Sequence, residues 1–338
     1  MKKGNNKAKY ILIVSFFVFA IAFFVALMVG RYSISLPDFI DCVFTNKAGF
    51  ETQESIIKNL RLPRTIMALL VGIGLSLSGL LYQEIFQNRL TSPDLLGVST
   101  GASVGAAIAI ILGLSSFFIS VFAFIMGVLA VIITLVIAKL FKNGSSMTLI
   151  LAGIIVSGFM SALLSLVKYF ADPTTTLATI SYWLMGSFEN SKMENILVIA
   201  PVVLISCLVL LFIAWKINIV SLGKEEAQSK GINYKVYRLI IIGISTLLTA
   251  LSVAFCGTIS WVGLVIPHIV RQLVGRNTKD TIPLCMSFGA GFMIVVDIFS
   301  RTFTDSEIPL SAITGFLGTI IFVVILICNR KEILNDHN

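Results

Sequence analysis

Charged side chains are scarce in this chain of 338 residues. Asp, Glu, Lys and Arg make up only 12% of it, whereas hydrophobic residues make up 57% and the mean hydropathy is +0.97. A typical soluble domain carries roughly 25% charged residues, because its surface must face water. So few charges cannot cover a water-facing globule of this length. The composition therefore excludes a soluble protein and predicts an integral membrane protein whose outer surface is solvated by lipid.

Histidine and paired cysteine are nearly absent as well. The chain has two His, which argues against a histidine-based metal or catalytic cluster, and none of its five Cys forms a C-x-x-C pair. Four of these Cys lie within apolar runs, where a small buried hydrophobic side chain is the expected role. We therefore expect no histidine-based metal or catalytic cluster, and we assign no catalytic residue, metal site or cofactor.

A phosphate-binding loop of the G-x-x-x-x-G-K-[ST] type is also missing. The glycine-rich stretch 95–107 (LLGVSTGASVGAA) lacks the lysine, so the chain is not itself an ATPase. Gly97, Gly101 and Gly105 are four residues apart, which places them on one face of a membrane helix and predicts the close approach of a neighbouring helix. A turn that contacts a ligand is the alternative interpretation of this stretch.

Long apolar runs are what the chain has in abundance. Backbone amides in lipid must be hydrogen-bonded within their own segment, so each run is predicted to be a helix and the fold class to be all-α. The ten runs cover about residues 11–30, 64–83, 95–113, 117–138, 147–168, 194–214, 239–256, 259–274, 282–300 and 309–328. The eighth is short and contains Pro267, which predicts a half-length or broken helix. The first follows a basic N-terminus, as in a signal peptide, but about twenty apolar residues without a convincing cleavage site predict a retained membrane helix.

The basic residues indicate how these helices are oriented. The net charge of +8 comes from Lys and Arg that are spread between the apolar runs, which speaks against nucleic-acid binding. Ten spans place both termini on one side, and that side then carries 17 of the 25 Lys and Arg, with the other 8 on the opposite side. The positive-inside rule therefore predicts a cell-membrane protein with both termini in the cytoplasm.

Two polar segments flank the membrane on opposite sides. On the predicted outer side, RLPR opens the second run, and Arg61 and Arg64 share a helix face. Headgroup anchoring and an acidic partner are both consistent with these two arginines. On the inner side, residues 216–238 are polar and charged, which is typical of a solvated loop or of a short helix that docks on a cytosolic partner. No linker or soluble domain interrupts the chain, so residues 1–338 are expected to form a single membrane domain.

Two polar residues lie inside apolar runs. Asp297 is four residues before Arg301, and because a buried acid in a membrane is costly, we expect the two to form an ion pair. A proton relay is the alternative role for Asp297. His268 follows Pro267, and a lone His beside a helix break is expected to be structural rather than a ligand.

Several stretches together resemble one family, the iron–siderophore and cobalamin (FecCD-type) permeases of binding-protein-dependent ABC importers. The resemblance covers about residues 10–330, and the order and spacing of its motifs are specific. The matching stretches are RLPRTIMALLVGIGLSLSG (61–79), FQNRLTSPDLLGVSTGA (86–102), LILAGI (149–154), YWLMGSF (182–188), LGKEEAQSKGI (222–232), GTISWVGLVIPHIVR (257–271), and DIFSR followed by EIP (297–309). The resemblance implies a type II ABC importer fold with ten helices per subunit. It also implies partners: a second permease, identical or homologous, two cytosolic ATP-binding subunits, and an extracytoplasmic binding protein.

The family pattern also implies roles for individual residues. By carry-over, Arg61, Arg64 and Arg301 would pair with acids on the binding protein. The residues implied to couple to the ATPase are Leu222, Gly223, Glu225, Glu226, Ala227, Ser229 and Gly231. The residues implied to form the cytoplasmic gate are Asn88, Leu90, Ser145, Ser146 and Met147. The chain departs from the family pattern at Lys224, Lys230 and Arg89, which leaves the choice of partner and the detail of the gate open.

The resemblance implies an importer subunit that releases a ferric siderophore into the cytoplasm without altering its bonds, driven by ATP hydrolysis on the partner subunits. Haem and cobalamin are alternative substrates within the family. A secondary transporter driven by an ion gradient is the main rival, and it would need more ion-coordinating groups in mid-membrane than Asp297 alone. A purely structural scaffold is the second rival, but it would need neither outward arginines nor a docking segment.

Overall fold

The computed structural model describes residues 2–44, 51–141 and 146–328, and every regular element in these ranges is a helix. The all-α prediction is therefore confirmed. In chain order the elements are α1 (Lys2–Met28), α2 (Leu36–Phe44), α3 (Glu51–Ser55), the π-helix η1 (Ile56–Arg61), α4 (Leu62–Phe86), the 3₁₀-helix η2 (Pro93–Leu96), α5 (Val98–Ile111), α6 (Ser116–Leu140), α7 (Ser146–Phe170), α8 (Thr176–Met185), α9 (Met193–Val220), α10 (Lys224–Ser229), α11 (Tyr234–Cys256), α12 (Val262–Val274), α13 (Thr278–Thr302) and α14 (Leu310–Cys328).

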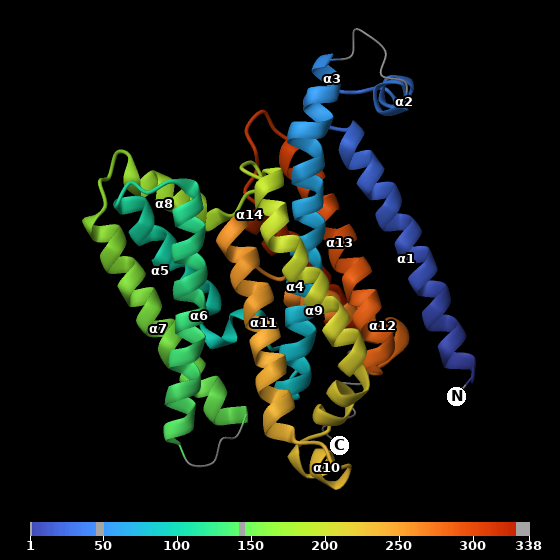
Figure 1. Ribbon diagram of the computed structural model, residues 1–338, viewed down its shortest axis with the longest axis vertical. Coiled ribbons are helices and arrows are strands. Elements are labelled where there is room, and N and C mark those ends of the chain that lie inside the picture. The colour runs from blue at the N-terminus through green and yellow to red at the C-terminus, as the bar shows by residue number, and fades with distance from the viewer. Residues whose placement is uncertain (1, 45–50, 142–145, 329–338) are drawn as a thin grey trace.

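The apolar helices correspond one by one to the ten apolar runs. Among the described residues, seven helices are long and apolar enough to cross a membrane, and α5, α12 and α14 are shorter apolar helices. The elements α3, η1 and α4 form one continuous helix of 36 residues, Glu51–Phe86. At 1.5 Å per residue this helix is about 54 Å long. A bilayer core is about 30 Å thick, so this helix is about 24 Å longer than the core and projects beyond it. Figure 1 shows this projection at one end of the molecule, beside α2.

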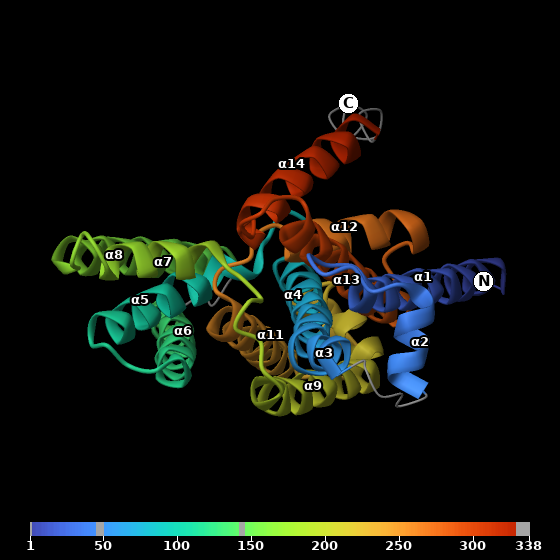
Figure 2. The same ribbon diagram turned by 90° about the horizontal axis from the view of Figure 1, so that it is seen from above.

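Helix α4 is the centre of the bundle. Its most apolar window is 83% buried, against 11% for α1 and 22% for α7, so α4 packs on protein all round while the outer helices present apolar side chains to lipid. Helices α9, α11, α12 and α13 surround α4. In the view from above, α5, α6, α7 and α8 form a second group on one side of α4, and α1 and α14 project from the rest of the bundle (Figure 2).

Glycines let these helices approach closely. A Cβ on Gly72 of α4 would lie 2.2 Å from the carbonyl oxygen of Gly289 of α13, so the two backbones are in direct contact. Gly101 and Gly105 lie on one face of α5, where added Cβ atoms would come within 2.6 Å and 2.3 Å of backbone oxygens of α6. The predicted packing role is thus confirmed for these two. Gly97 differs: it precedes α5 at φ +84° and faces Ser157 of α7, because the 3₁₀-helix η2 interrupts the helical spacing.

Helices α5 and α12 are too short to cross the membrane alone, with 14 and 13 residues. The expected half-length eighth helix is therefore confirmed as α12, whereas the shortness of α5 was not predicted. Pro267 lacks an N–H, so it leaves the carbonyl of Gly263, four residues earlier, without its helical partner. The buried Gln83 of α4 donates from Nε2 to this oxygen at 3.2 Å. Irregular backbone at this depth is tolerated because protein side chains satisfy it.

Candidate functional site

The end of the bundle where α2 and α3 lie (Figure 1) contains a buried network of charges. Arg64, in the first turn of α4, donates from Nε to Asp297 Oδ1 of α13 at 2.6 Å. Its two terminal nitrogens reach Glu307, on the loop between α13 and α14, at 2.6 Å and 3.0 Å. This two-pronged contact has the geometry that makes arginine–carboxylate pairs specific. One guanidinium therefore joins α4, α13 and the loop that leads to α14.

Arg301 completes the network. Its Nε lies 3.4 Å from Asp297 Oδ2, so the predicted Asp297–Arg301 ion pair is confirmed, and Arg64 is an additional partner. Arg301 also donates from Nη2 to the backbone oxygen of Ala26 at 2.5 Å, near the C-terminal end of α1. Asp297 is fully buried between two guanidiniums, an arrangement that compensates the cost of burying its charge. Glu307 was not singled out from the sequence, although its EIP motif was noted.

Arg61 binds the end of α1. Its Nη1 donates to the carbonyl oxygens of Leu27 at 2.9 Å and Met28 at 2.6 Å, and its Nη2 donates to that of Tyr32. The last carbonyls of a helix lack intrahelical donors and carry partial negative charge, so a guanidinium is well suited to them. Arg61 thereby caps the C-terminus of α1 and fixes that helix to α4.

The three arginines expected to dock a binding protein lie at the predicted end but are buried. Arg61, Arg64 and Arg301 are 5%, 8% and 6% exposed, and each is bonded to groups of its own chain. Docking through them would require these internal contacts to open, and that role stays a prediction. What this geometry provides is a clamp that holds α1, α4, α13 and the α13–α14 loop together.

The clamp leads to a test of Arg61. We expect Arg61→Ala to lower the free energy of unfolding by about 2 kcal/mol, because the carbonyls at the end of α1 lose a charged donor. Thermal unfolding of the purified protein in detergent measures the change. Arg31→Ala is the matched control, since Arg31 is exposed in the neighbouring loop. Equal losses for the two variants would contradict the capping role.

The opposite end of the bundle holds the predicted coupling segment. Helix α10 lies at this end, which is also the end of the N-terminus (Figure 1). Gly223 and Gly231 bound it with φ of +114° and +71°, values that favour glycine. Ala227 is fully buried and fixes α10 to the bundle. The remaining members of the predicted set that face solvent are Leu222, Glu225, Glu226 and Ser229.

The gate residues predicted from the sequence lie at this same end. Those that the structure describes are Asn88, Leu90, Ser146 and Met147, and Ser145 falls outside the described residues. Leu90 and Met147 are 63% and 65% exposed. Ser146 Oγ, at the start of α7, lies 3.5 Å from the backbone oxygen of Ile85 in the last turn of α4. The structure thus brings the last turn of α4 and the start of α7 together, and the gate role of these residues stays a prediction.

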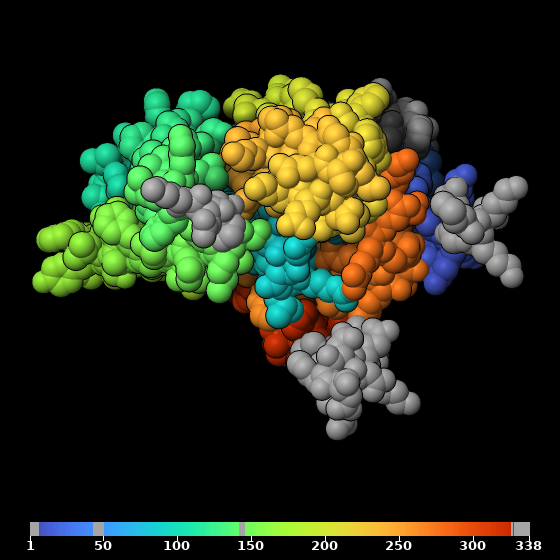
Figure 3. All heavy atoms as spheres, turned by 90° about the horizontal axis from the view of Figure 1, so that it is seen from below, coloured from blue at the N-terminus to red at the C-terminus, as the bar shows by residue number. Residues whose placement is uncertain are grey.

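Further contacts tie this connection to α10 and α12. Gln87 Nε2 donates to the Ser221 carbonyl at 2.8 Å, just before α10, and Arg271 of α12 forms an ion pair with Glu84 of α4 at 2.9 Å. In Figure 3 the segment around α10 forms a broad central surface, flanked by the α4–α5 connection and by α12 and the start of α13. Neither Gln87 nor Glu84 was predicted from the sequence as a contact residue. For Glu84, an acid at the end of an apolar run was the available signal.

His268 has no ligand-like surroundings. It is 8% exposed, and its ring packs on Phe322 of α14 with centroids 5.9 Å apart. Within the described ranges no three His, Cys, Asp or Glu side chains are grouped as a metal site would require. The described cysteines, Cys42, Cys207, Cys256 and Cys285, are free and buried, as expected of small hydrophobic residues.

Comparison with known proteins agrees with this architecture. Residues 18–328 match the FecCD transport family. The chain is 38% identical to the molybdate import system permease protein MolB of Haemophilus influenzae, over 92% of this chain and 94% of that protein. It is 35% identical to a probable iron chelatin transport system permease protein of Helicobacter pylori, over 90% and 94%. A solved structure described as an inward-facing conformation of a putative metal-chelate type ABC transporter superposes with a TM-score of 0.86 at 37% identity, covering 94% of this chain and 99% of that one.

Proposed function

Because the chain belongs to the FecCD transport family and is an ABC importer permease of the inner membrane, we propose that it imports a ferric chelate, in the first place a ferric siderophore. The similarity to the iron chelatin permease of Helicobacter pylori supports this substrate class. Molybdate is a second candidate, favoured by the similarity to the Haemophilus influenzae permease. Haem and cobalamin are the further alternatives within the family.

The energy for transport comes from ATP hydrolysis on two cytosolic subunits that dock on α10. The exposed side chains of α10 are available to such a partner, whereas its buried Ala227 holds it to the bundle. The Gln87–Ser221 hydrogen bond then joins the segment before α10 to the α4–α5 connection, where Asn88 and Leu90 lie. Movement of α10 is in this way passed to the gate.

A second permease subunit, identical or homologous, covers part of α7. The exposed residues of α7 include Gly158, Ser161, Ala162 and Ser165, which are small or carry a hydroxyl group. A face of this kind suits a neighbouring helix or a polar passage better than lipid tails. Substrate would pass between the two subunits, each of which works as one membrane domain.

The end with α10 faces the cytoplasm, and the end with α2, α3 and α8 faces outward. The positive-inside distribution supports this orientation, which places both termini in the cytoplasm. A substrate-loaded binding protein then docks on the outer end, near the α13–α14 loop. There Glu307 occupies the guanidinium of Arg64, so an acid of the binding protein would have to compete with Glu307 for it.

Uptake by proteoliposomes tests the proposal. The permease is reconstituted with its ATPase subunits and its binding protein, and a ferric siderophore, molybdate, haem and cobalamin are offered in turn. We expect uptake of the ferric siderophore only when ATP is present on the side of the membrane that carries the ATPase subunits. Uptake that persists without ATP and collapses with an ion gradient would establish the secondary-transporter rival, and uptake of molybdate alone would reassign the substrate.

Charge reversal on α10 tests the coupling role in the same assay. We expect Glu225→Lys with Glu226→Lys to lower ATP-dependent uptake at least tenfold, a loss of about 1.4 kcal/mol in effective coupling, because like charges at an interface oppose docking. Thermal stability should not change, since both side chains are exposed. Glu189→Lys with Glu194→Lys is the matched control at the opposite end of the bundle. Retained uptake and retained co-purification of the ATPase would refute the role of α10.

A further inference from the structure

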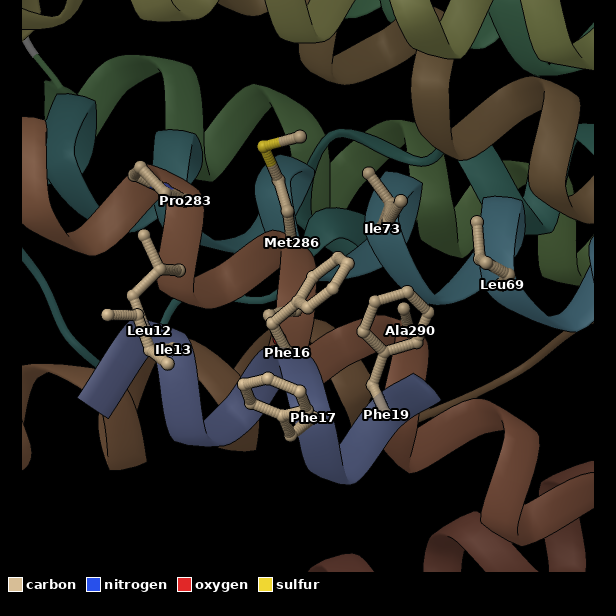
Figure 4. Close-up of a pocket in the computed structure, with 11 residues that line it drawn as sticks. Leu12, Ile13, Phe16, Phe17, Phe19, Leu69, Ile73, Pro283, Met286 and Ala290 are labelled. Carbon is tan, nitrogen blue, oxygen red and sulfur yellow. The ribbon is translucent and has the colours of Figure 1, made fainter. Parts of the chain in front are cut away.

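An open apolar groove lies between the middle of α1 and the helices α4 and α13. It has a volume of about 570 Å³, and its lining includes Leu12 and Phe16 of α1, Leu69 of α4, and Met286 and Ala290 of α13. Figure 4 shows the aromatic side chains of α1 on one side of the space and Met286 and Ala290 on the other. Apart from Ser287, every residue that lines the groove is hydrophobic.

The groove opens sideways, within the membrane. Helices α1 and α13 run parallel, since Arg301 contacts Ala26 near the C-terminal ends of both, and Phe19 approaches Gly291 in their middle. Phe16 and Phe17 line the groove and remain 56% and 62% exposed on its outer side. Because both helices cross the bilayer, the space is open to lipid rather than to water.

A lysine lies on the groove face of each helix, beyond the groove on the N-terminal side. Lys9 precedes Leu12, Ile13 and Phe16 by three, four and seven residues, so it lies in line with them on α1, whereas Lys7 points to the opposite face. Lys279 precedes Pro283 and Met286 by four and seven residues on α13 in the same way. Both lysines are exposed. Two ammonium groups therefore stand at one end of an apolar groove.

We propose that this groove binds one acyl chain of an anionic phospholipid, whose phosphate lies between Lys9 and Lys279. An apolar slot ending in two cations matches an acyl chain ending in an anionic headgroup, and lysines reach the headgroup level by extending along the helix. A helix about 10 Å across would fill 570 Å³ with only about 1.3 turns, so the space is short for a partner helix. The lipid wedges α1 against the central bundle at the end opposite the Arg61 and Arg301 contacts.

Native mass spectrometry of the permease–ATPase complex tests this site. The complex is purified in detergent at low salt and titrated with phosphatidylglycerol and with phosphatidylcholine of the same chain length. We expect tighter binding of one phosphatidylglycerol. Lys9→Gln with Lys279→Gln should weaken that binding about 30-fold, which corresponds to about 1 kcal/mol for each lysine near an anionic headgroup. Lys7→Gln with Lys139→Gln is the control, because Lys7 lies on the far face of α1 and Lys139 ends α6.

A second variant tests the groove itself. Met286→Trp fills the space without changing the charge, so it should weaken the retention of both lipids in that site while the lysines remain. If the wild type and the lysine double variant bound phosphatidylglycerol equally, the bound lipid would be ordinary annular lipid. That result would overturn the proposal. A protein subunit retained on α1 in place of lipid would overturn it too. Since Lys9 and Lys279 are exposed, their double variant remains decisive even if Met286→Trp does not fold.

Discussion

Replacing Asp297 with Asn is expected to lower the free energy of unfolding by about 3–5 kcal/mol, because removing one partner of a buried ion pair leaves the other charge uncompensated. Asp297 is fully buried and lies between Arg64 and Arg301. Arg64 would retain Glu307, but Arg301 would keep only neutral acceptors beside it, the Ala26 carbonyl and the amide oxygen at position 297, while the cations Arg61 and Arg64 stay near. The loss should loosen α1 and α13 from α4 at the end where α2 and α3 lie.

The buried cysteines provide the measurement for Asp297→Asn. A thiol-reactive fluorophore labels Cys207, Cys256 and Cys285 only when the bundle opens, so its signal on heating reports unfolding in detergent. Asp305→Asn is the matched control, because Asp305 is exposed on the loop that follows α13. If both variants unfolded at the wild-type temperature, the buried network would contribute nothing to stability and the clamp would be refuted.

Gly79→Ala is expected to cost about 3 kcal/mol or more, and to reduce the yield of folded protein. The added Cβ would lie 1.8 Å from the carbonyl oxygen of Gly263, whereas favourable contacts between heavy atoms lie near 3.5 Å. No rotamer change relieves a clash with backbone, so α4 and α12 would have to separate. Their separation would also break the hydrogen bond from Gln83 to the same oxygen and disturb Pro93, which packs on Gly263.

Gly243→Ala is the matched control for Gly79→Ala. Gly243 lies in the interior of α11 with no neighbouring atom within 4 Å of an added Cβ. Alanine is favoured over glycine inside a helix by roughly 0.5–1 kcal/mol, so this control should be neutral or slightly stabilising. The same thiol-labelling assay compares the two variants. If Gly79→Ala changed the stability as little as Gly243→Ala, α4 and α12 would be less closely packed than the backbone contact indicates.

Most of the helical architecture could be predicted from the sequence, because the preference of each apolar run for lipid depends only on its own residues. The proline in the eighth run correctly predicted the short helix α12. The shortness of α5 escaped prediction, since its break lies in the glycine-rich stretch 95–107, which contains no proline, and depends on how η2 packs. Pro93 lies against Gly263, and Leu96 accepts a hydrogen bond from Thr134. These contacts come from distant helices and have no local signal.

The candidate site was predicted less completely. The arginines at 61, 64 and 301 stand out in the sequence as cations at the less basic end. That placement does not determine whether their side chains are exposed or buried. The structure buries them because the end of α1 and the acid Asp297 lie within reach. Near α10, the polar segment was evident, whereas its link to α4 through Gln87 was not, because an ordinary glutamine after an apolar run carries no signal of its partner.

The sequence by itself determined that this protein is a membrane protein, where its apolar helices lie along the chain, and that its two polar segments lie at opposite ends of the bundle. These properties depend on the transfer of each segment from water to lipid, and that free energy is a local sum over its residues. Only the tertiary structure decided that Arg64 meets acids 233 and 243 residues away, and that α1 leaves an apolar groove beside α13. Such contacts depend on the rotation and spacing of the packed helices, which close glycine contacts such as Gly72–Gly289 fix in space.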